Sequence, residues 1–172
     1  ETDVALLNGA YFFIQPPDGE IALSRRGDFG VDTENRLVDG AGNLILSDGL
    51  QPIVLPPFSA MKFSDNGEVL VRQPGALSGD FTSVGFLGSA SPSPDGLTKS
   101  LDGKIRNLDG SIPDVDQSGL FAQGILEGSN VNAIEEMVLS MDMQRQFEIN
   151  VKLIKQAEEI DKSSTKLMSL PM

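Results

Sequence analysis

Cysteine, histidine and tryptophan are absent from this chain of 172 residues, and tyrosine occurs once. Without cysteine and histidine the chain has no thiolate nucleophile, no disulfide, no serine–histidine–aspartate triad and no Cys/His zinc site. No apolar run approaches the roughly 20 residues that a membrane-spanning helix needs. These absences exclude most classes of enzyme and argue against direct insertion into a membrane.

Basic residues are also scarce. The 13 Lys and Arg residues face 25 Asp and Glu residues, for a formal net charge of -12 and a pI near 4.3. Nucleic acids and anionic lipids are bound through clustered Lys and Arg, and the sequence holds no such cluster. We therefore expect no nucleic-acid partner. The lone doublet Arg25-Arg26 stands among acidic residues and predicts a surface ion pair on a strand.

Glycine and proline are missing from one part of the chain only. All 18 glycines lie at or before Gly128, and neither glycine nor proline occurs in residues 129–170. Both residue types disfavour the interior of a helix. The sequence therefore predicts a β-rich body over residues 1–126 and a C-terminal helical segment over residues 127–172.

The body alternates short apolar runs with turn dipeptides. Asp-Gly and Asn-Gly pairs tolerate the positive φ angles that tight hairpin turns require. The expected strands include residues 11–14, 21–23, 44–46, 53–55, 69–71 and 84–87, whereas residues 89–95 are expected to form an exposed loop. This spacing predicts a mainly β fold of hairpin strands, sandwich-like or barrel-like, followed by one long C-terminal α-helix.

Asparagine marks the start of that helix. Either Asn130 or Asn132 is suited to cap it, and with Asn132 as the cap Glu135 falls at the third helical position. Helical sequence then continues to about residue 170, close to 38 residues or about 57 Å. Isolated helices are marginal in water, so a helix of this length needs partners.

The apolar residues of the helix fall on two faces rather than one. Met143, Phe147, Val151 and Ile154 mark one face, and Ile149, Leu153, Ile160 and Leu167 mark another. We therefore expect the helix to pack in a bundle between subunits, with a single helix lying along its own β body as the alternative. The residues predicted to form this packing are Met137, Met141, Phe147, Val151, Ile154 and Ile160.

Candidate catalytic and metal sites are weak. Residues 114–119 match the first half of a calcium-binding EF-hand loop, but Ile125 occupies the position that should supply a bidentate glutamate. Carboxylate pairs are the only conceivable catalytic set, and no particular pair stands out. The sequence predicts no catalytic residue, no metal ligand and no cofactor, and therefore no enzyme.

Several segments resemble a known family. The run QGILEGSNVN at residues 123–132, followed by Glu135-Glu136-Met137-Val138, closely resembles the C-terminal signature of bacterial flagellar rod and hook proteins. Residues 7–13, 24–29 and 36–38 are similar to β motifs of that family, in the same order. Within it, residues 145–152 and Asn132 are most like the proximal rod type (FlgF type), and the distal rod type is the alternative.

The resemblance implies a structural subunit of the flagellar basal-body rod, a motility component without catalytic activity. Family members pair an N-terminal helix with the C-terminal helix near the axis of a helical polymer, which transmits torque and lines an export channel. That N-terminal helix and its Ala-Asn-rich motif are not in this sequence, so we expect the chain to be a fragment.

The resemblance also implies partners and a location. Expected partners are other rod and hook-type axial proteins, further copies of the subunit, and the flagellar type III export apparatus. The expected location is the rod where it crosses the periplasm, reached without a cleaved signal peptide. The residues themselves leave one alternative from another class, a secreted β-domain binding module with a dimerisation helix. Such a module needs an exposed aromatic platform, and we expect most aromatic residues to lie in the core.

Overall fold

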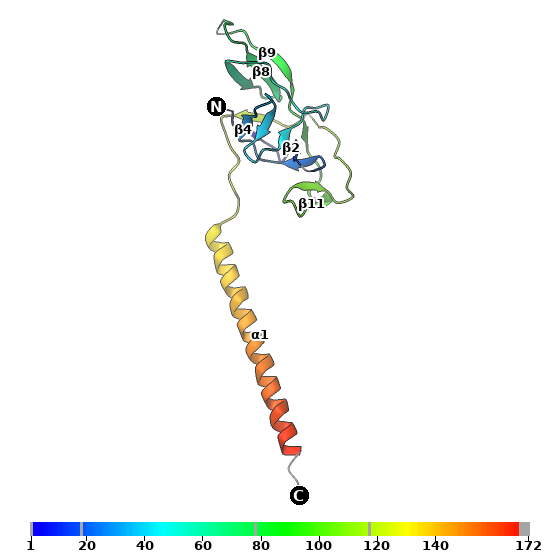
Figure 1. Cartoon of the computed structure of the whole chain (residues 1–172), viewed down its shortest axis with the longest axis vertical. Helices are drawn as coiled ribbons and strands as arrows, with labels where there is room; N and C mark the ends of the chain where they lie inside the picture. Colours follow the sequence, from blue (N-terminus) through cyan, green and yellow to red (C-terminus); the bar gives the residue numbers. More distant parts are fainter. Residues whose placement is uncertain (1, 18, 78, 117, 169–172) are drawn as a thin grey trace. The chain divides into compact units, whose positions relative to one another are not determined.

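The computed structural model describes residues 2–17, 19–77, 79–116 and 118–168, with side chains as far as Thr165. The chain divides into two compact units, Glu1–Glu127 and Gly128–Met172. The first is a β body, and the second carries a single helix, α1 (Ala133–Met168) (Figure 1). The prediction of a mainly β fold that ends in one long helix is confirmed, with open sheets rather than a closed barrel among the described residues.

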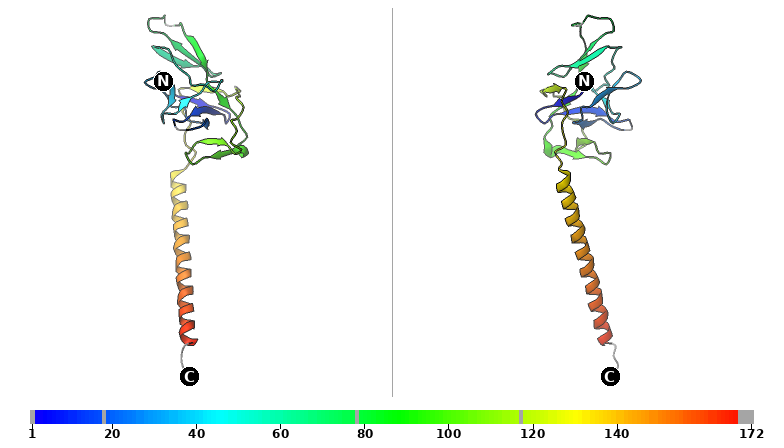
Figure 2. Two further views of the ribbon diagram at one scale, coloured as in Figure 1. Left: turned by 45° about the vertical axis from the view of Figure 1, so that its right-hand side comes forward. Right: turned by 90° about the vertical axis from the view of Figure 1, so that its left-hand side faces the viewer.

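Three antiparallel sheets make up the body. β1 pairs with β13, β7–β8–β9 form a second sheet, and the third runs in the order β11-β12-β3-β2-β6-β5-β4, with β10 also paired to β2. The β7–β8–β9 sheet lies at one end of the body and the β11–β12 hairpin at the other (Figure 2). The bounds are β1 (Val4–Leu6), β2 (Tyr11–Gln15), β3 (Ala22–Ser24), β4 (Phe29–Val31), β5 (Leu37–Asp39), β6 (Leu44–Ile45), β7 (Ala60–Phe63), β8 (Glu68–Arg72), β9 (Thr82–Phe86), β10 (Ser89–Ala90), β11 (Leu97–Lys99), β12 (Ile105–Asn107) and β13 (Phe121–Gln123).

The Asn-Gly and Asp-Gly turns join these strands. At the turn between β7 and β8, Gly67 has a φ of 82°, which only glycine adopts without strain. A Cβ atom there would also lie 2.6 Å from the ring of Phe121, so the site excludes larger residues for a second reason. Between β1 and β2, Asn8 and Gly9 take φ angles of 61° and 76° in a tight turn that leads from one sheet to another, because β1 pairs with β13 and not with β2.

Phenylalanine rings organise the core. Phe12 packs edge-on against Phe29 at 5.0 Å between ring centroids, and Phe29 packs against Phe63 at 5.8 Å. Phe121 lies 6.1 Å from Phe12, which ties β13 to the same cluster. The expectation that the aromatic residues of the body are mainly core residues is confirmed, because these four and Phe13 are buried.

Two local predictions about the body are wrong. Residues 53–55 form no regular strand, only an isolated bridge between Arg36 and Val54, because prolines at 52, 56 and 57 cannot donate to a ladder. Residues 89–95 are not an exposed loop throughout. Ser89 and Ala90 form β10 and are fully buried against β2, while Pro94–Gly96 is a short 3₁₀ turn. Serine and proline signal a loop locally, but the pairing partner of β10 is distant in sequence.

Helix α1 has 36 residues, about 54 Å at 1.5 Å per residue. It runs without interruption, as the absence of glycine and proline predicts. The predicted end near residue 170, the proline at 171 and the side chain of Leu167 lie outside the described residues.

Candidate assembly site

The helix begins at a side-chain cap. The Oδ1 atom of Asn132 accepts a hydrogen bond from the Ile134 amide at 3.1 Å, and the Asn132 carbonyl accepts one from the Glu136 amide. Asn130 does not cap the helix, and the neighbouring turn is held by the Ser129 hydroxyl, which accepts a bond from the Val131 amide. Glu135 and Glu136 lie in the first turn, where negative charge is favourable.

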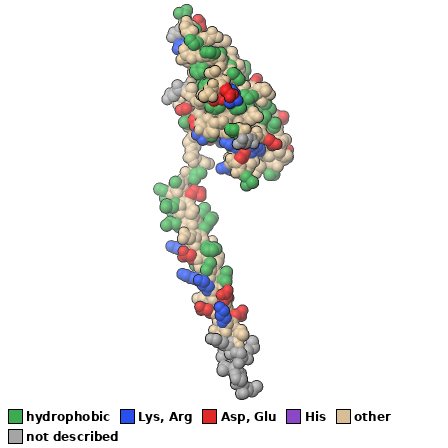
Figure 3. All heavy atoms as spheres, in the orientation of Figure 1, with side chains coloured by type: hydrophobic (Ala, Val, Ile, Leu, Met, Phe, Trp, Pro, Cys, Tyr) green, Lys and Arg blue, Asp and Glu red, His purple; other side chains and the backbone are tan. Residues whose placement is uncertain are grey.

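The apolar residues of α1 face solvent. Met137, Met141, Phe147, Ile154 and Ile160 are all exposed, Phe147 to 69%, and Val151 is partly buried. Figure 3 shows hydrophobic side chains along the surface of the helix, mixed with charged ones toward its C-terminal part. Apolar surface on this scale marks an interaction site when a soluble chain presents it.

At 3.6 residues per turn, two apolar faces are centred about 130° apart around the helix. One face carries Met143, Phe147, Val151 and Ile154, and the other carries Ile149, Leu153 and Ile160. A single neighbouring helix covers one narrow stripe. The arrangement is therefore suited to contacts on two sides, as in a bundle of several helices.

The body ends in a segment held at two points. The Gly124 amide donates to the Asp3 carbonyl at 2.8 Å, directly after β13. Three residues later, Glu127 Oε2 lies 2.9 Å from Arg25 Nε. The Arg25 guanidinium in turn lies 5.4 Å from the centroid of the Tyr11 ring. The partners of Gly124 and Glu127 could not be predicted from the sequence, because each lies more than 100 residues away along the chain.

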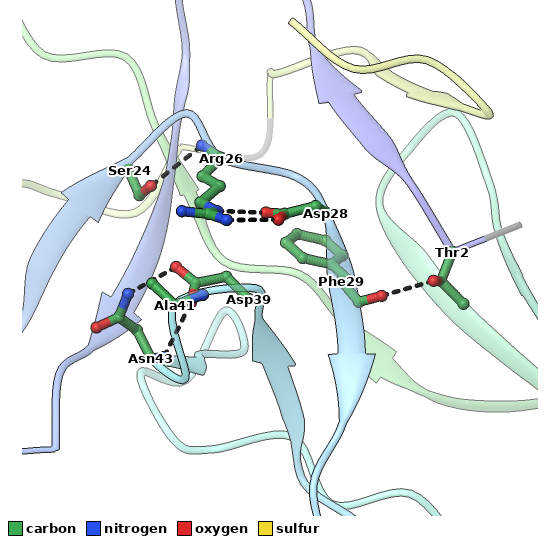
Figure 4. A network of polar contacts seen from close by, with 8 residues as sticks. All are labelled: Thr2, Ser24, Arg26, Asp28, Phe29, Asp39, Ala41 and Asn43. Atoms are coloured by element: carbon green, nitrogen blue, oxygen red, sulfur yellow. Dashed lines mark hydrogen bonds and ion pairs between the residues drawn. The ribbon is translucent and has the colours of Figure 1, made fainter.

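Arg26 points to a different partner. It forms a two-pronged ion pair with Asp28, at 2.6 and 2.8 Å, and Ser24 accepts a bond from its amide (Figure 4). Hydrogen bonding to Arg26 lowers the pKa of Asp28. The prediction that the Arg25-Arg26 doublet forms surface ion pairs is confirmed, but its placement on a strand is wrong, because both residues lie in the connection between β3 and β4.

A buried carboxylate closes the neighbouring turn. Asp39 accepts bonds from the amides of Ala41 and Asn43 and from the Asn43 side chain, so its charge is satisfied inside the body. A Cβ atom at Gly40 would overlap Asp28, which explains why glycine follows Asp39. Asp39-Gly40 is one of the Asp-Gly pairs that predict a turn, and the structure adds that the Asn43 side chain closes it.

One cleft of the body is lined by carboxylates. A cleft of about 630 Å³ is lined by Asp109, Asp114 and Asp116 among other residues. Hydrogen bonds from Ser111 and Ser118 lower the pKa of Asp109 and Asp116, respectively, the opposite of what a general acid requires. In the residues described, no group of three or more His, Cys, Asp or Glu side chains is placed to hold a metal ion.

In the loop that resembles an EF-hand, the carboxylate of Asp116 is engaged in a local turn. Both carboxylate oxygens of Asp116 bond to Ser118, at 2.8 Å to its amide and 2.7 Å to its hydroxyl. Residue 117 of that loop lies outside the described residues. Over the described part of the chain, no helix is both long and apolar enough to cross a membrane.

Comparison with known families identifies the chain. A family model described as "Flagellar basal body rod FlgEFG protein C-terminal" matches residues 122–167, and one described as "Flagellar hook protein FlgE/F/G D1 domain" matches residues 6–71. The chain belongs to the flagellar basal-body rod FlgE/F/G family. The first match covers the end of β13, residues 124–132 (called the exit segment below) and α1 as far as residue 167. The second contains Phe12, Phe29 and Phe63 of the ring cluster and the turn at Asp39, but not Phe121.

Individual relatives agree with this family. The chain is 31% identical over 166 residues to the rod protein FlgG of Buchnera aphidicola subsp. Schizaphis graminum, covering 92% of this chain and 62% of that protein. It is 34% identical over 167 residues to FlgG of Borreliella burgdorferi, with the same coverage. It is 27% identical over 175 residues to FlgF of Salmonella typhimurium, covering 98% of this chain and 68% of that protein.

The chain thus spans 62% of the length of the FlgG relatives from Buchnera and Borreliella. Relatives named FlgF and FlgG match at comparable identity, so identity does not separate the two types. The sequence-based resemblance to flagellar rod proteins is confirmed at the level of the family. This family is one of structural components of the flagellar basal body.

Proposed function

We propose that this chain is part of a structural subunit of the flagellar basal-body rod. The observation that carries the proposal is the helix of 36 residues with exposed apolar side chains on two faces, in a chain of this family. Identical subunits that bury two such faces against different neighbours form a helical array rather than a closed pair. An array of this kind transmits torque and encloses an export channel through stiffness and interface area.

The two units take different roles in this proposal. The body, with its own buried core, forms the rod-body domain, and residues 127–172 provide axial packing between subunits. Met137, Met141, Phe147, Val151, Ile154 and Ile160 make that packing, and Asn132 fixes the entry of the helix, whereas the other expected residue, Asn130, makes no capping bond. The cap made by Asn132 and the exposure of the packing residues support this assignment.

The partners and location follow from the family. We propose contacts with other rod and hook-type axial proteins and with further copies of the subunit, in the part of the rod that crosses the periplasm. Delivery is by the flagellar type III export apparatus, without a cleaved signal peptide. A chain without cysteine suits this route, because no disulfide can trap it during export or in an oxidising compartment. No enzymatic activity is part of the proposal.

We assign the subunit to the proximal rod, the FlgF type. Residues 145–152 resemble the tail of that type, and the match to the Salmonella FlgF covers 98% of the chain. The test is cross-complementation. The intact gene should restore rods in a strain that lacks FlgF and fail in one that lacks FlgG, and the reverse result would assign it to the distal rod.

The function itself is tested by deleting the intact gene in its source bacterium and viewing purified basal bodies by electron microscopy. Missing or truncated rods, restored by the wild-type gene, are the expected result. Normal rods and normal motility would contradict the proposal and return attention to the binding-module hypothesis, which glycan binding would then test.

Complementation with variants locates the interface. Phe147→Asp places a charge on an apolar face and should block incorporation while the body stays folded. Phe147→Leu keeps the face apolar and should complement. Phe81→Asp makes the same chemical change at an exposed phenylalanine of the body and should also complement. Rods built with Phe147→Asp would exclude this face of α1 from assembly.

A further inference from the structure

Glu127 is the last residue of the body and the only acidic residue between Asp116 and Glu135. Residues 124–132 form no helix or strand, and both apolar residues just before Glu127, Ile125 and Leu126, are exposed by half or more. Burial of side chains therefore does not hold this segment. Its position depends on the polar contacts that it makes.

Arg25 supplies one of those contacts. Its Nε atom is buried, makes no hydrogen bond and lies 2.9 Å from Glu127 Oε2, in an ion pair whose two side chains are each more than a third exposed. The Arg25 guanidinium also lies over the ring of Tyr11, 5.4 Å from its centroid. An exposed ion pair is weak by itself, and the cation–π contact adds to the attraction that holds the guanidinium in place.

Strand register places Tyr11 and Arg25 together. β2 and β3 are antiparallel, with Phe12 opposite Ser24, so their neighbours Tyr11 and Arg25 lie side by side at the end of the hairpin. Both strands belong to the central sheet, and β2 is bonded to β3, β6 and β10. The guanidinium is thus carried by a rigid part of the body.

We propose that Glu127 is a positioning residue. Its ion pair with Arg25, which is itself stacked on Tyr11, fixes the exit segment to the body as far as residue 127, so that the connection to α1 begins at Gly128. The ion pair and its effect on the exit segment do not depend on the proposed function. Only the consequence for rod assembly in the cell rests on that function. It links two of the family-like segments, residues 24–29 and 123–132, through one charge pair.

The test is nuclear magnetic resonance relaxation on the full chain. In the wild type, backbone order parameters from residue 124 to residue 127 should stay near the rigid value of about 0.85. Glu127→Gln removes the charge and should lower those of residues 125 to 127 below about 0.6, while residue 124 keeps its bond to Asp3 and thermal unfolding of the body is unchanged. Glu20→Gln makes the same change at another exposed position and should leave them as in the wild type.

The double variant Arg25→Glu with Glu127→Arg reverses the pair and should restore most of the lost order, whereas Arg25→Glu alone should not. High salt should act like Glu127→Gln, because it screens an exposed charge pair. Unchanged order parameters in Glu127→Gln, or no recovery in the reversed pair, would overturn the proposal. Normal rods in the gene deletion would instead contradict the rod function and leave this positioning role intact.

Discussion

The body and α1 differ in where they place their large apolar side chains. The body buries the rings of Phe12, Phe13, Phe29, Phe63 and Phe121 and satisfies the buried carboxylate of Asp39 with three hydrogen bonds. In α1, all the large apolar side chains that the structure describes are exposed, apart from Val151. A folded chain gains most of its stability from buried apolar surface. The body therefore has a core of its own and α1 has none, which is why we propose that the apolar side chains of α1 pack against a neighbour.

The charge distribution supports this contrast. Residues 1–129 hold 18 acidic and 8 basic residues, and residues 130–172 hold 7 acidic and 5 basic residues. The nearly balanced helix lets identical copies approach each other without strong repulsion.

The largest difference between the body and α1 is expected when one phenylalanine of each is replaced by alanine. Phe12→Ala should cost about 3–5 kcal/mol of the free energy of unfolding of the body, because it leaves a cavity where a fully buried ring stood. Phe147→Ala should change the unfolding free energy of the free chain by less than about 0.5 kcal/mol. Chemical denaturation measures both. Similar losses in the two variants would mean that α1 is already packed in the free chain.

A second test uses two glycines of the body. A Cβ atom at Gly27 would overlap the carbonyl of Val4, a backbone atom that cannot turn away, whereas one at Gly30 meets nothing within 4 Å. Gly27→Ala should therefore destabilise the body by about 1–3 kcal/mol or more. Gly30→Ala should be nearly neutral in the same denaturation experiment. Equal effects would show that the body tolerates movement of β1 against the segment before β4.

The helix has its own smaller test at the cap. Asn132→Ala removes the oxygen that accepts the Ile134 amide and should cost about 1 kcal/mol, seen by circular dichroism as lost helix content. Asn130→Ala removes no capping bond and is the control. If Asn130→Ala has the larger effect, the helix starts earlier in solution than Asn132.

The smallest effect concerns an exposed carboxylate of the body. Hydrogen bonding to Arg106 lowers the pKa of Asp102 from 3.8 to about 2. Since this pKa is lower in the folded state than in the unfolded chain, the stabilisation is fully present above about pH 4 and is lost as the pH falls toward about 2. Thermal melting as a function of pH should show the wild type lose its advantage over Asp102→Asn in this window. A constant difference across the window would contradict the ionised pair.

The sequence correctly predicted the features that depend on residues close together in the chain. The loss of glycine and proline after Gly128 predicted α1, the Asn-Gly turns appear where expected, and the family segments matched. It was a poor guide at Ser89, whose polar neighbours indicate a loop although the residue is fully buried in β10. The six packing residues proposed for α1 stay predictions, because the structure shows them exposed, or partly buried in the case of Val151, and not in contact with a neighbour.

The division into a β body and a helix follows from the sequence, because the backbone preferences of glycine and proline and the capping of a helix act within a few residues. Which distant side chains contact each other depends on the tertiary structure. Arg25 reaches Glu127 because β1 pairs with β13 and β2 pairs with β3, and both pairings depend on strand register. Register is set by the packing of the whole core, which no short window of sequence contains.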